Sequence, residues 1–337
     1  MRLKTLLLTA TLVASSSSAF AGPISGLYVF GDSLSDNGNL SLIGASVGIA
    51  VPNAPYAPGR ATNGLTAVEQ LALQLALPLT PALTPVAGGN NYAVIGAATG
   101  PVPAPAGPDN VVATYGITLP LPTGILNAQV PLFLSRLTAP IDPDALFFIW
   151  GGANDLFILP TDDVATQAAA NIGMAFDLLY GAGARRFLIP NLPDLGLAPG
   201  AGAASSALSS SSEEFNVRLG QRLATRQFYP GIRLAQYDVF QTFNRVVAHP
   251  GLYGFTNVED ECYLGAPLAV VPPSVVCGAP SAYLFWDGSH PTAAGHALLG
   301  EGFSEAVSDM NAVPEPLTMT LVGLGLVATV RRRRRAA

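Results

Sequence analysis

A serine, a histidine and an aspartate of this chain stand in surroundings that suit acyl-transfer chemistry. Ser33 follows an apolar run, residues 24–30, and a turn that begins at Gly31. Asp287 and His290 lie three residues apart in the short polar turn DGSH. A histidine can take the proton of a serine hydroxyl during attack, and a neighbouring carboxylate can fix the ring's tautomer and stabilise the imidazolium. Ser33, Asp287 and His290 are therefore a candidate catalytic triad.

Each of these residues also has a structural interpretation. Ser33 can cap a helix that follows it, and Asp287 can cap the last helix and leave His290 exposed. The other two histidines suit structural roles better. His249 ends an expected helix, where a cation suits the local dipole, and His296 lies inside the final helix.

Acyl transfer also needs donors for the oxyanion of the tetrahedral intermediate. The backbone N–H groups of Ser33 and Gly96 are available, and Gly96 lets a substrate approach the backbone closely. The side-chain amide of Asn154 can supply a third donor, although an asparagine at such a position is also typical of turns and caps. These three residues are the candidate oxyanion hole.

The elements that must position these residues alternate between strands and helices. Short apolar runs bounded by turn residues predict strands at 24–30, 92–95, 145–150, 186–190 and 232–237. Helices are expected at 63–77, 126–137, 162–180, 213–227 and 291–307. Loops are expected at 41–61, 97–124 and 256–285, and a low-complexity run at 200–212 precedes the helix at 213–227. This order predicts a mainly parallel sheet covered on both faces, with Ser33, Gly96 and Asn154 at the carboxyl ends of strands.

Composition bounds the class of protein. The 337 residues are 50% apolar and 11% charged, and the body from residue 22 to 312 carries nine basic and 21 acidic residues and no lysine. A net charge of −12 without a basic stripe argues against nucleic acid as a partner. Cys262 and Cys277 are expected to form a disulfide, and no second cysteine pair or nearby histidine suggests a metal site.

The two ends resemble targeting signals. Residues 1–21 have a basic start, an apolar centre and a small-residue finish, the pattern of a secretory signal peptide. Residues 313–337 contain Pro-Glu-Pro, an apolar run and five arginines. That arrangement resembles the PEP-CTERM sorting signal of Gram-negative bacteria. The resemblance implies processing by an exosortase, in addition to signal peptidase, transient membrane contact, and a periplasmic, cell-surface or extracellular destination. A simple tail anchor is the alternative, disfavoured by the short apolar run.

Four sequence blocks in order resemble the GDSL, or SGNH, serine hydrolases. They are GDSLSDNGN (31–39), NYAVIGA (91–97), GAND (152–155) and DGSH (287–290), and the segment PGRATNG (58–64) is similar to secreted lipases and esterases of this family. The resemblance implies a three-layer, flavodoxin-like α/β fold for residues 22–312, with a five-stranded sheet. It implies the triad and oxyanion roles given above, with Asp32 and Asp36 ordering the loop around the serine. Ile95 stands where many members have a second glycine, so a narrowed site or a shifted Gly96 N–H is expected.

The sequence therefore predicts a secreted serine ester hydrolase that forms an acyl-enzyme on Ser33 and needs no metal or organic cofactor. Its substrate would be an acyl lipid or an acylated small molecule, with the apolar loops 41–57 and 97–124 accepting acyl chains. A carbohydrate O-acetyl esterase acting on exopolysaccharide is the first alternative. A non-catalytic surface or matrix protein on the same fold is the second.

Overall fold

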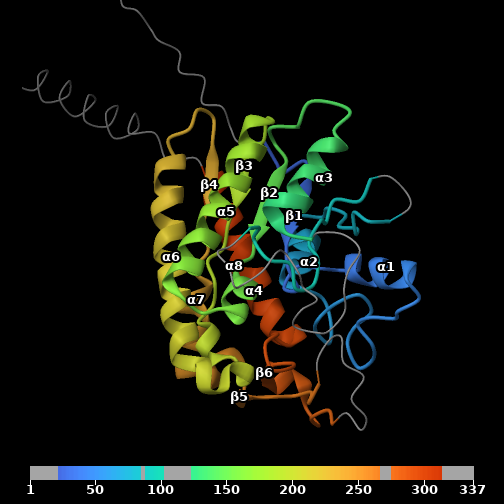
Figure 1. Cartoon of the computed structure of the whole chain (residues 1–337), viewed down its shortest axis with the longest axis vertical. Coiled ribbons are helices and arrows are strands. Elements are labelled where there is room, and N and C mark those ends of the chain that lie inside the picture. The colour runs from blue at the N-terminus through green and yellow to red at the C-terminus, as the bar shows by residue number, and fades with distance from the viewer. Residues whose placement is uncertain (1–21, 85–87, 102–122, 266–274, 313–337) are drawn as a thin grey trace, which may run out of the picture. The chain divides into compact units, whose positions relative to one another are not determined.

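Four parallel strands form the central sheet of the computed structural model (Figure 1). The structure describes residues 22–84, 88–101, 123–265 and 275–312. In spatial order the strands are β1 (Leu27–Gly31), β2 (Leu146–Trp150), β3 (Arg186–Leu188) and β4 (Arg233–Ala235). Gly31 at the end of β1 pairs with Trp150 at the end of β2, so these strands end at the same edge of the sheet. The chain continues from that edge into Ser33 and Asn154.

Helices cover both faces of this sheet, because alternate strand residues enter two separate apolar cores. On β2, Phe147 and Ile149 join one core, while Leu146, Phe148 and Trp150 join the other. The first core is closed by α3 (Val130–Ser135), α5 (Asp162–Gly181) and α6 (Ser205–Arg226). The second is closed by α2 (Ala67–Gln74), α7 (Val239–Ala248) and α8 (Ala293–Asn311). The three-layer α/β architecture predicted from the sequence is therefore present.

Of the five predicted strands, the one at 92–95 does not form. The segment runs beside β1, where the N–H of Tyr92 donates to the carbonyl of Val29 at 2.7 Å, but its ladder pairing with β1 is limited to one bridge between Val29 and Asn91. The Oδ1 of Asn91 accepts the N–H of Ala93 at 3.0 Å, and the N–H of Val94 reaches the carbonyl of Gly31 at 3.2 Å. The sheet therefore has four strands where five were expected.

Two segments outside the expected helices contain helix. Within 41–61, α1 (Asn39–Ser46) forms because the carboxylate of Asp36 accepts the N–H groups of Gly38, Asn39 and Leu40 and so caps its first turn. Within 200–212, α6 begins at Ser205, eight residues before the expected start. The hydroxyls of Ser211 and Ser212 are satisfied inside the helix by the carbonyls four residues earlier, so both side chains can be buried.

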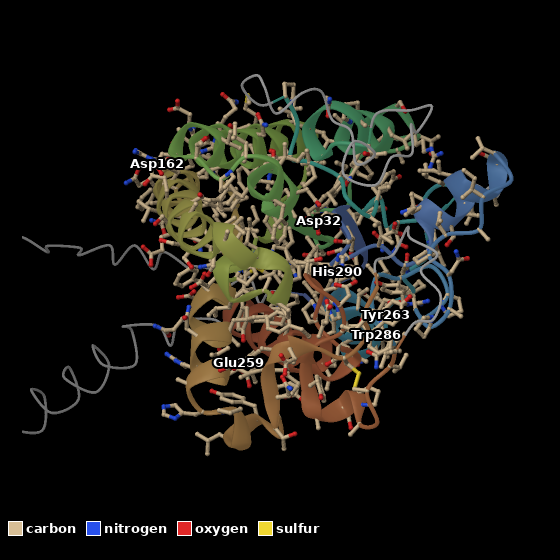
Figure 2. All side chains as sticks on the ribbon, turned by 60° about the horizontal axis from the view of Figure 1, so that its bottom comes forward. Asp32, Asp162, Glu259, Tyr263, Trp286 and His290 are labelled. Atoms are coloured by element: carbon tan, nitrogen blue, oxygen red, sulfur yellow. A yellow bond between two sulfur atoms is a disulfide. The ribbon has the colours of Figure 1, made fainter. Side chains whose placement is uncertain are left out.

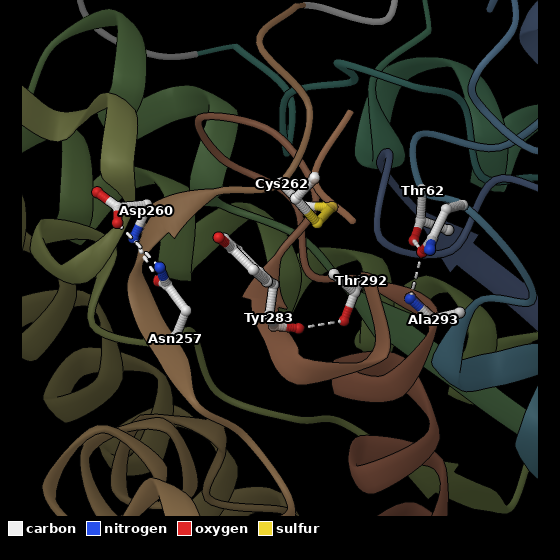
Figure 3. Close-up of a disulfide and its surroundings, with 9 residues drawn as sticks. Thr62, Asn257, Asp260, Cys262, Tyr283, Thr292 and Ala293 are labelled. Atoms are coloured by element: carbon white, nitrogen blue, oxygen red, sulfur yellow. Dashed lines mark hydrogen bonds between the residues drawn. A yellow bond between two sulfur atoms is a disulfide. The ribbon is translucent and has the colours of Figure 1, made fainter. Parts of the chain in front are cut away.

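The predicted loop 256–285 contains a second, two-stranded sheet. Its parallel strands are β5 (Asn257–Glu261) and β6 (Tyr283–Phe285). The disulfide between Cys262 and Cys277 forms as predicted, directly after β5 (Figure 3). Closing a loop of this length stabilises the fold by about 3 kcal/mol in the chain-entropy model.

The other elements follow the predicted order with shifted ends. Thr66 caps α2 in a capping box with Glu69, and the expected helix 126–137 is a π-helical turn, Ile125–Gln129, followed by α3. A short helix, α4 (Ala153–Ile158), starts directly after β2. Residues 23–310 form one compact unit. In the described part of the chain, every helix is too short or too polar to cross a lipid bilayer.

Candidate active site

Ser33 sits on the first turn after β1. The Asp32 carboxylate accepts the N–H of Leu34 at 3.0 Å, and the Asp32 carbonyl accepts the N–H groups of Ser35 and Asp36. These bonds fold the chain sharply at the strand end and hold Ser33 at the sheet edge, with 7% of its surface exposed. Asp32 and Asp36 thus order this loop, in line with the structural role expected for them.

The structure brings Ser33, His290 and Asp287 into one hydrogen-bonded chain. The Oγ of Ser33 lies 2.8 Å from Nε2 of His290, and Nδ1 of His290 lies 2.8 Å from both carboxylate oxygens of Asp287. The hydroxyl, imidazole and carboxylate are all buried. This order of contacts is the one that lets an imidazole deprotonate a serine hydroxyl while a carboxylate holds the ring.

The Asp287–His290 turn is built by the same carboxylate that contacts the imidazole. Oδ1 of Asp287 accepts the backbone N–H of Ser289 at 2.9 Å and of His290 at 2.8 Å. The alternative in which Asp287 caps the last helix is wrong, because α8 starts later and Thr292 Oγ1 accepts the N–H of Gly295 in its first turn. His290 is buried and faces Ser33.

The electrostatics of the pair favour a charged Asp287 and a basic His290. Burial alone raises the pKa of Asp287, but the His290 imidazole, Tyr56 and the Ser289 N–H outweigh it and lower the pKa below its ordinary value. Burial likewise lowers the pKa of His290, and the Asp287 carboxylate outweighs it, so that the pKa lies above its ordinary value. A raised pKa makes His290 a stronger proton acceptor.

The carboxyl groups of Asp32 and Asp155 are also buried near this site. Burial raises the pKa of Asp32 to about 6, and Oδ2 of Asp32 has no hydrogen-bond partner within the described ranges. Burial raises the pKa of Asp155 to about 7, although Thr99 donates to that carboxylate through its hydroxyl and its N–H. Asp155 thereby fixes the chain beside Asn154.

Asn154 and Gly96 occupy neighbouring segments at the same sheet edge. Asn154 stands in the first turn of α4, lines the same cavity as Ser33 and His290, and donates from Nδ2 to the carbonyl of Ala97 at 3.1 Å. Gly96 has a φ of 73°, which glycine adopts without strain, in the turn just before Ala97. Gly96 does not itself line the cavity in the part of the chain that the structure describes.

Ile95 does not narrow this site. Its side chain packs in a small apolar core with Leu40 and Ile43 of α1, and it is absent from the described cavity lining. The N–H of Ile95 donates to Asp36 Oδ2 at 2.9 Å, which ties the 95–97 turn to the loop that carries the serine. The residue that departs from the family pattern is therefore accommodated in the core.

A cavity of about 340 Å³ opens at Ser33 and His290. Its deeper lining comes from β2, α7, β6 and α8 and consists of buried apolar side chains: Trp150, Val239, Phe243, Phe285 and Leu299. Residues 41–57, which the sequence suggested as an acyl-binding loop, are not among the described lining residues, and most of the other suggested loop, 97–124, lies outside the described residues. The described lining contains no group of His, Cys, Asp and Glu side chains that could hold a metal ion.

A fourth polar residue joins the triad, and no sequence motif announces it. The hydroxyl of Tyr56 donates to Oδ2 of Asp287 at 2.6 Å. Tyr56 packs edge-on against Tyr263 and Trp286, in a cluster that also contains Cys262. Figure 2 shows Tyr263 and Trp286 next to each other. Because Tyr56 lies in a stretch predicted as loop, 231 residues from its partner, only the folded chain reveals the contact.

We expect Tyr56→Phe to lower kcat/KM about tenfold, since a hydrogen bond to a charged group contributes roughly 1.5–3 kcal/mol. Without this hydrogen bond the Asp287 carboxylate would interact more strongly with His290 and raise the pKa of the imidazole further. The midpoint of the kcat/KM pH profile should therefore move upward. Tyr263→Phe removes a hydroxyl from the same aromatic cluster without touching Asp287 and serves as the control. Equal behaviour of the two variants would show that the Tyr56 hydroxyl does not act on the triad.

Family models match two parts of the chain. Residues 27–303 match the model of the GDSL-like lipase/acylhydrolase family. Residues 312–335 match the PEP-CTERM protein-sorting motif, which indicates export and sorting in Gram-negative bacteria.

Curated relatives match over most of the chain. A GDSL esterase/lipase of Arabidopsis thaliana is 27% identical across 88% of this chain and 89% of its own length. Esterase EstA of Pseudomonas aeruginosa is 29% identical across 88% of this chain and 49% of its own length. Among solved structures, an extracellular lipase of Streptomyces rimosus matches with a TM-score of 0.36 at 17% identity, over 85% of this chain and all of that one. By the family match over most of its length, the chain belongs to the GDSL-like lipase/acylhydrolase family of ester hydrolases.

Proposed function

We propose that this protein hydrolyses carboxylic esters through an acyl-enzyme on Ser33. The observation that carries the proposal is the continuous contact from Ser33 Oγ through His290 to Asp287 at the mouth of an apolar cavity. In the first half-reaction Ser33 Oγ attacks the ester carbonyl carbon and His290 Nε2 takes the hydroxyl proton. The carbon–oxygen bond to the alcohol then breaks, and His290 returns the proton to the leaving alkoxide.

In the second half-reaction water replaces the alcohol. His290 takes a proton from the water, whose oxygen attacks the acyl carbon, and Ser33 leaves with the proton that His290 returns. The products are a carboxylic acid and the regenerated serine. Asp287 keeps the imidazole oriented and stabilises its charged form throughout both steps.

The oxyanion of each tetrahedral intermediate would be bound by Ser33, Gly96 and Asn154. The backbone N–H groups of Ser33 and Gly96 donate to no acceptor among the described residues, and Asn154 uses one Nδ2 hydrogen on Ala97, which leaves the second for a substrate. Donors fixed before the reaction stabilise developing charge without reorganisation. Ser33 and Asn154 line the cavity, which supports their oxyanion roles, and Gly96 would contribute from the adjoining turn.

The apolar interior of the cavity favours an acyl group longer than acetyl. Each methylene removed from water contributes about 0.8 kcal/mol, or roughly fourfold in kcat/KM. Against p-nitrophenyl esters below their micellar concentrations, we therefore expect kcat/KM to rise from acetate to butyrate and hexanoate, with Ser33→Ala as the blank. A sharp fall beyond acetate would contradict this preference and support a carbohydrate O-acetyl esterase.

The ends of the chain support an exported enzyme. We propose that residues 1–21 are removed as a signal peptide and that an exosortase cleaves near Pro314-Glu315-Pro316, after transient contact of the following apolar run with the membrane. The mature hydrolase would then act in the periplasm, at the cell surface or outside the cell. The disulfide between Cys262 and Cys277 is consistent with such an oxidising location.

A further inference from the structure

A carboxylate outside the triad faces the cavity beside His290. Glu261, the last residue of β5, lines the cavity together with Ser33 and His290. A Cβ placed on Gly288 would lie 3.2 Å from Oε2 of Glu261, which puts this carboxylate directly against the turn from Asp287 to His290. Burial, and then the charge of Asp287, raise the pKa of Glu261, in keeping with its position inside the cavity.

The described lining offers Glu261 no permanently charged cation. Among the residues that the structure describes, no arginine or lysine lines the cavity, and no hydrogen-bond donor contacts the Glu261 side chain. The internal stretches outside the description, 85–87, 102–122 and 266–274, contain neither lysine nor arginine in their sequence. The described lining includes one further acid besides Asp287, Asp194, whose Oδ1 is held by the N–H of Gly196 and the hydroxyl of Ser209.

The position of Glu261 corresponds to the alcohol side of a bound ester. His290 must protonate the leaving oxygen, so the alcohol portion of the substrate lies next to the turn that carries His290. Glu261 lies against that same turn. The rim also carries Phe157, an exposed aromatic residue of α4, whose ring face can attract a cation.

We propose that Glu261 selects esters whose alcohol carries a cationic nitrogen, such as a quaternary ammonium group. This inference rests on the proposed ester hydrolysis at Ser33 and adds its substrate class. A cationic alcohol brings the charge that the described lining lacks, while an anionic alcohol meets Glu261, Asp194 and Asp287. The apolar interior remains available to the acyl chain.

The test compares butyrylcholine with 3,3-dimethylbutyl butyrate, in which carbon replaces the quaternary nitrogen. Hydrolysis of both is followed by acid release at constant pH. We expect the wild-type protein to prefer the choline ester about tenfold in kcat/KM, and Glu261→Gln to reduce this ratio to near one. Raising the salt concentration from 0.05 to 0.5 M shortens the Debye length and screens the charge of Glu261. The wild-type ratio should therefore fall, and the ratio of Glu261→Gln should stay unchanged.

Glu259→Gln is the matched control. It makes the same change of charge on the same strand, but Glu259 is exposed and does not line the described cavity, and Figure 2 places it away from His290. This variant should keep the wild-type ratio.

A wild-type ratio near one overturns the role of Glu261, and so does a ratio that Glu261→Gln leaves unchanged. The wild-type ratio alone decides the matter if that variant does not fold. A protein that hydrolyses neither ester, and takes no serine-directed label on Ser33, overturns the proposed function itself and the role of Glu261 with it.

Discussion

Ser33→Ala is expected to reduce kcat for short-chain aryl esters by about 10⁴-fold to 10⁶-fold, because the attacking oxygen of the acyl-enzyme route is removed. The folded state should keep its melting temperature. The Ser33 hydroxyl contacts His290 at a cavity mouth that water can enter, and the turn around it is held by backbone groups and by the Asp32 carboxylate. Activity and thermal unfolding of the purified protein measure the two effects separately.

Ser35→Ala is the matched control for this loss. Ser35 belongs to the same turn, and its buried hydroxyl has no hydrogen-bond partner among the described residues. A fluorophosphonate probe should label the wild type and Ser35→Ala on Ser33 and should leave Ser33→Ala unlabelled. Undiminished turnover by Ser33→Ala would refute the acyl-enzyme on this residue.

Asp287→Asn is expected to lower kcat by about 10⁴-fold without unfolding the turn. The asparagine Oδ1 can still accept the N–H groups of Ser289 and His290, which Asp287 accepts now. Its amide group would instead donate to Nδ1 of His290. The proton would then move to Nε2, where it blocks the uptake of the proton from Ser33.

The pH profile distinguishes this effect from a loss of structure. Only neutral His290 can act as the base, so wild-type kcat/KM should rise with pH through a midpoint above 6.5, the ordinary value for histidine. The Asp287 charge raises the pKa of His290, and burial lowers it. Asp287→Asn removes the charge and leaves the burial, so the pKa of His290 should fall. The residual activity of Asp287→Asn should therefore rise at a lower pH, and an unchanged midpoint would contradict the pairing of the two residues.

The triad could be predicted because each part has a local signature. A glycine turn after an apolar strand marks Ser33, and a polar turn before the last helix marks Asp287 and His290. Parallel strands then bring such turns to one edge, as the structure shows for the ends of β1 and β2. The cysteine pair could be predicted on the same grounds, because its spacing and the chain's export signal both favour a disulfide.

The start of α1, the segment 92–95 and the Tyr56–Asp287 contact could not be predicted, because they depend on side-chain contacts that have no sequence signature. Asp36 caps the start of α1 in a glycine- and alanine-rich stretch, and Asn91 bonds the N–H of Ala93 inside the apolar run 92–95, each through a side chain that contacts backbone groups. Tyr56 reaches Asp287 from a segment without periodicity. In each case a polar side chain forms a hydrogen bond that shapes the fold, and the hydrophobic pattern of the sequence does not predict such bonds.

The order of the triad along the chain has a consequence for biogenesis. Ser33 and His290 are 257 residues apart and meet only when the first strand and the final turn occupy one sheet edge. During synthesis Ser33 is made early and His290 almost last. A nascent chain that ends before His290 therefore carries the serine without the base that would activate it.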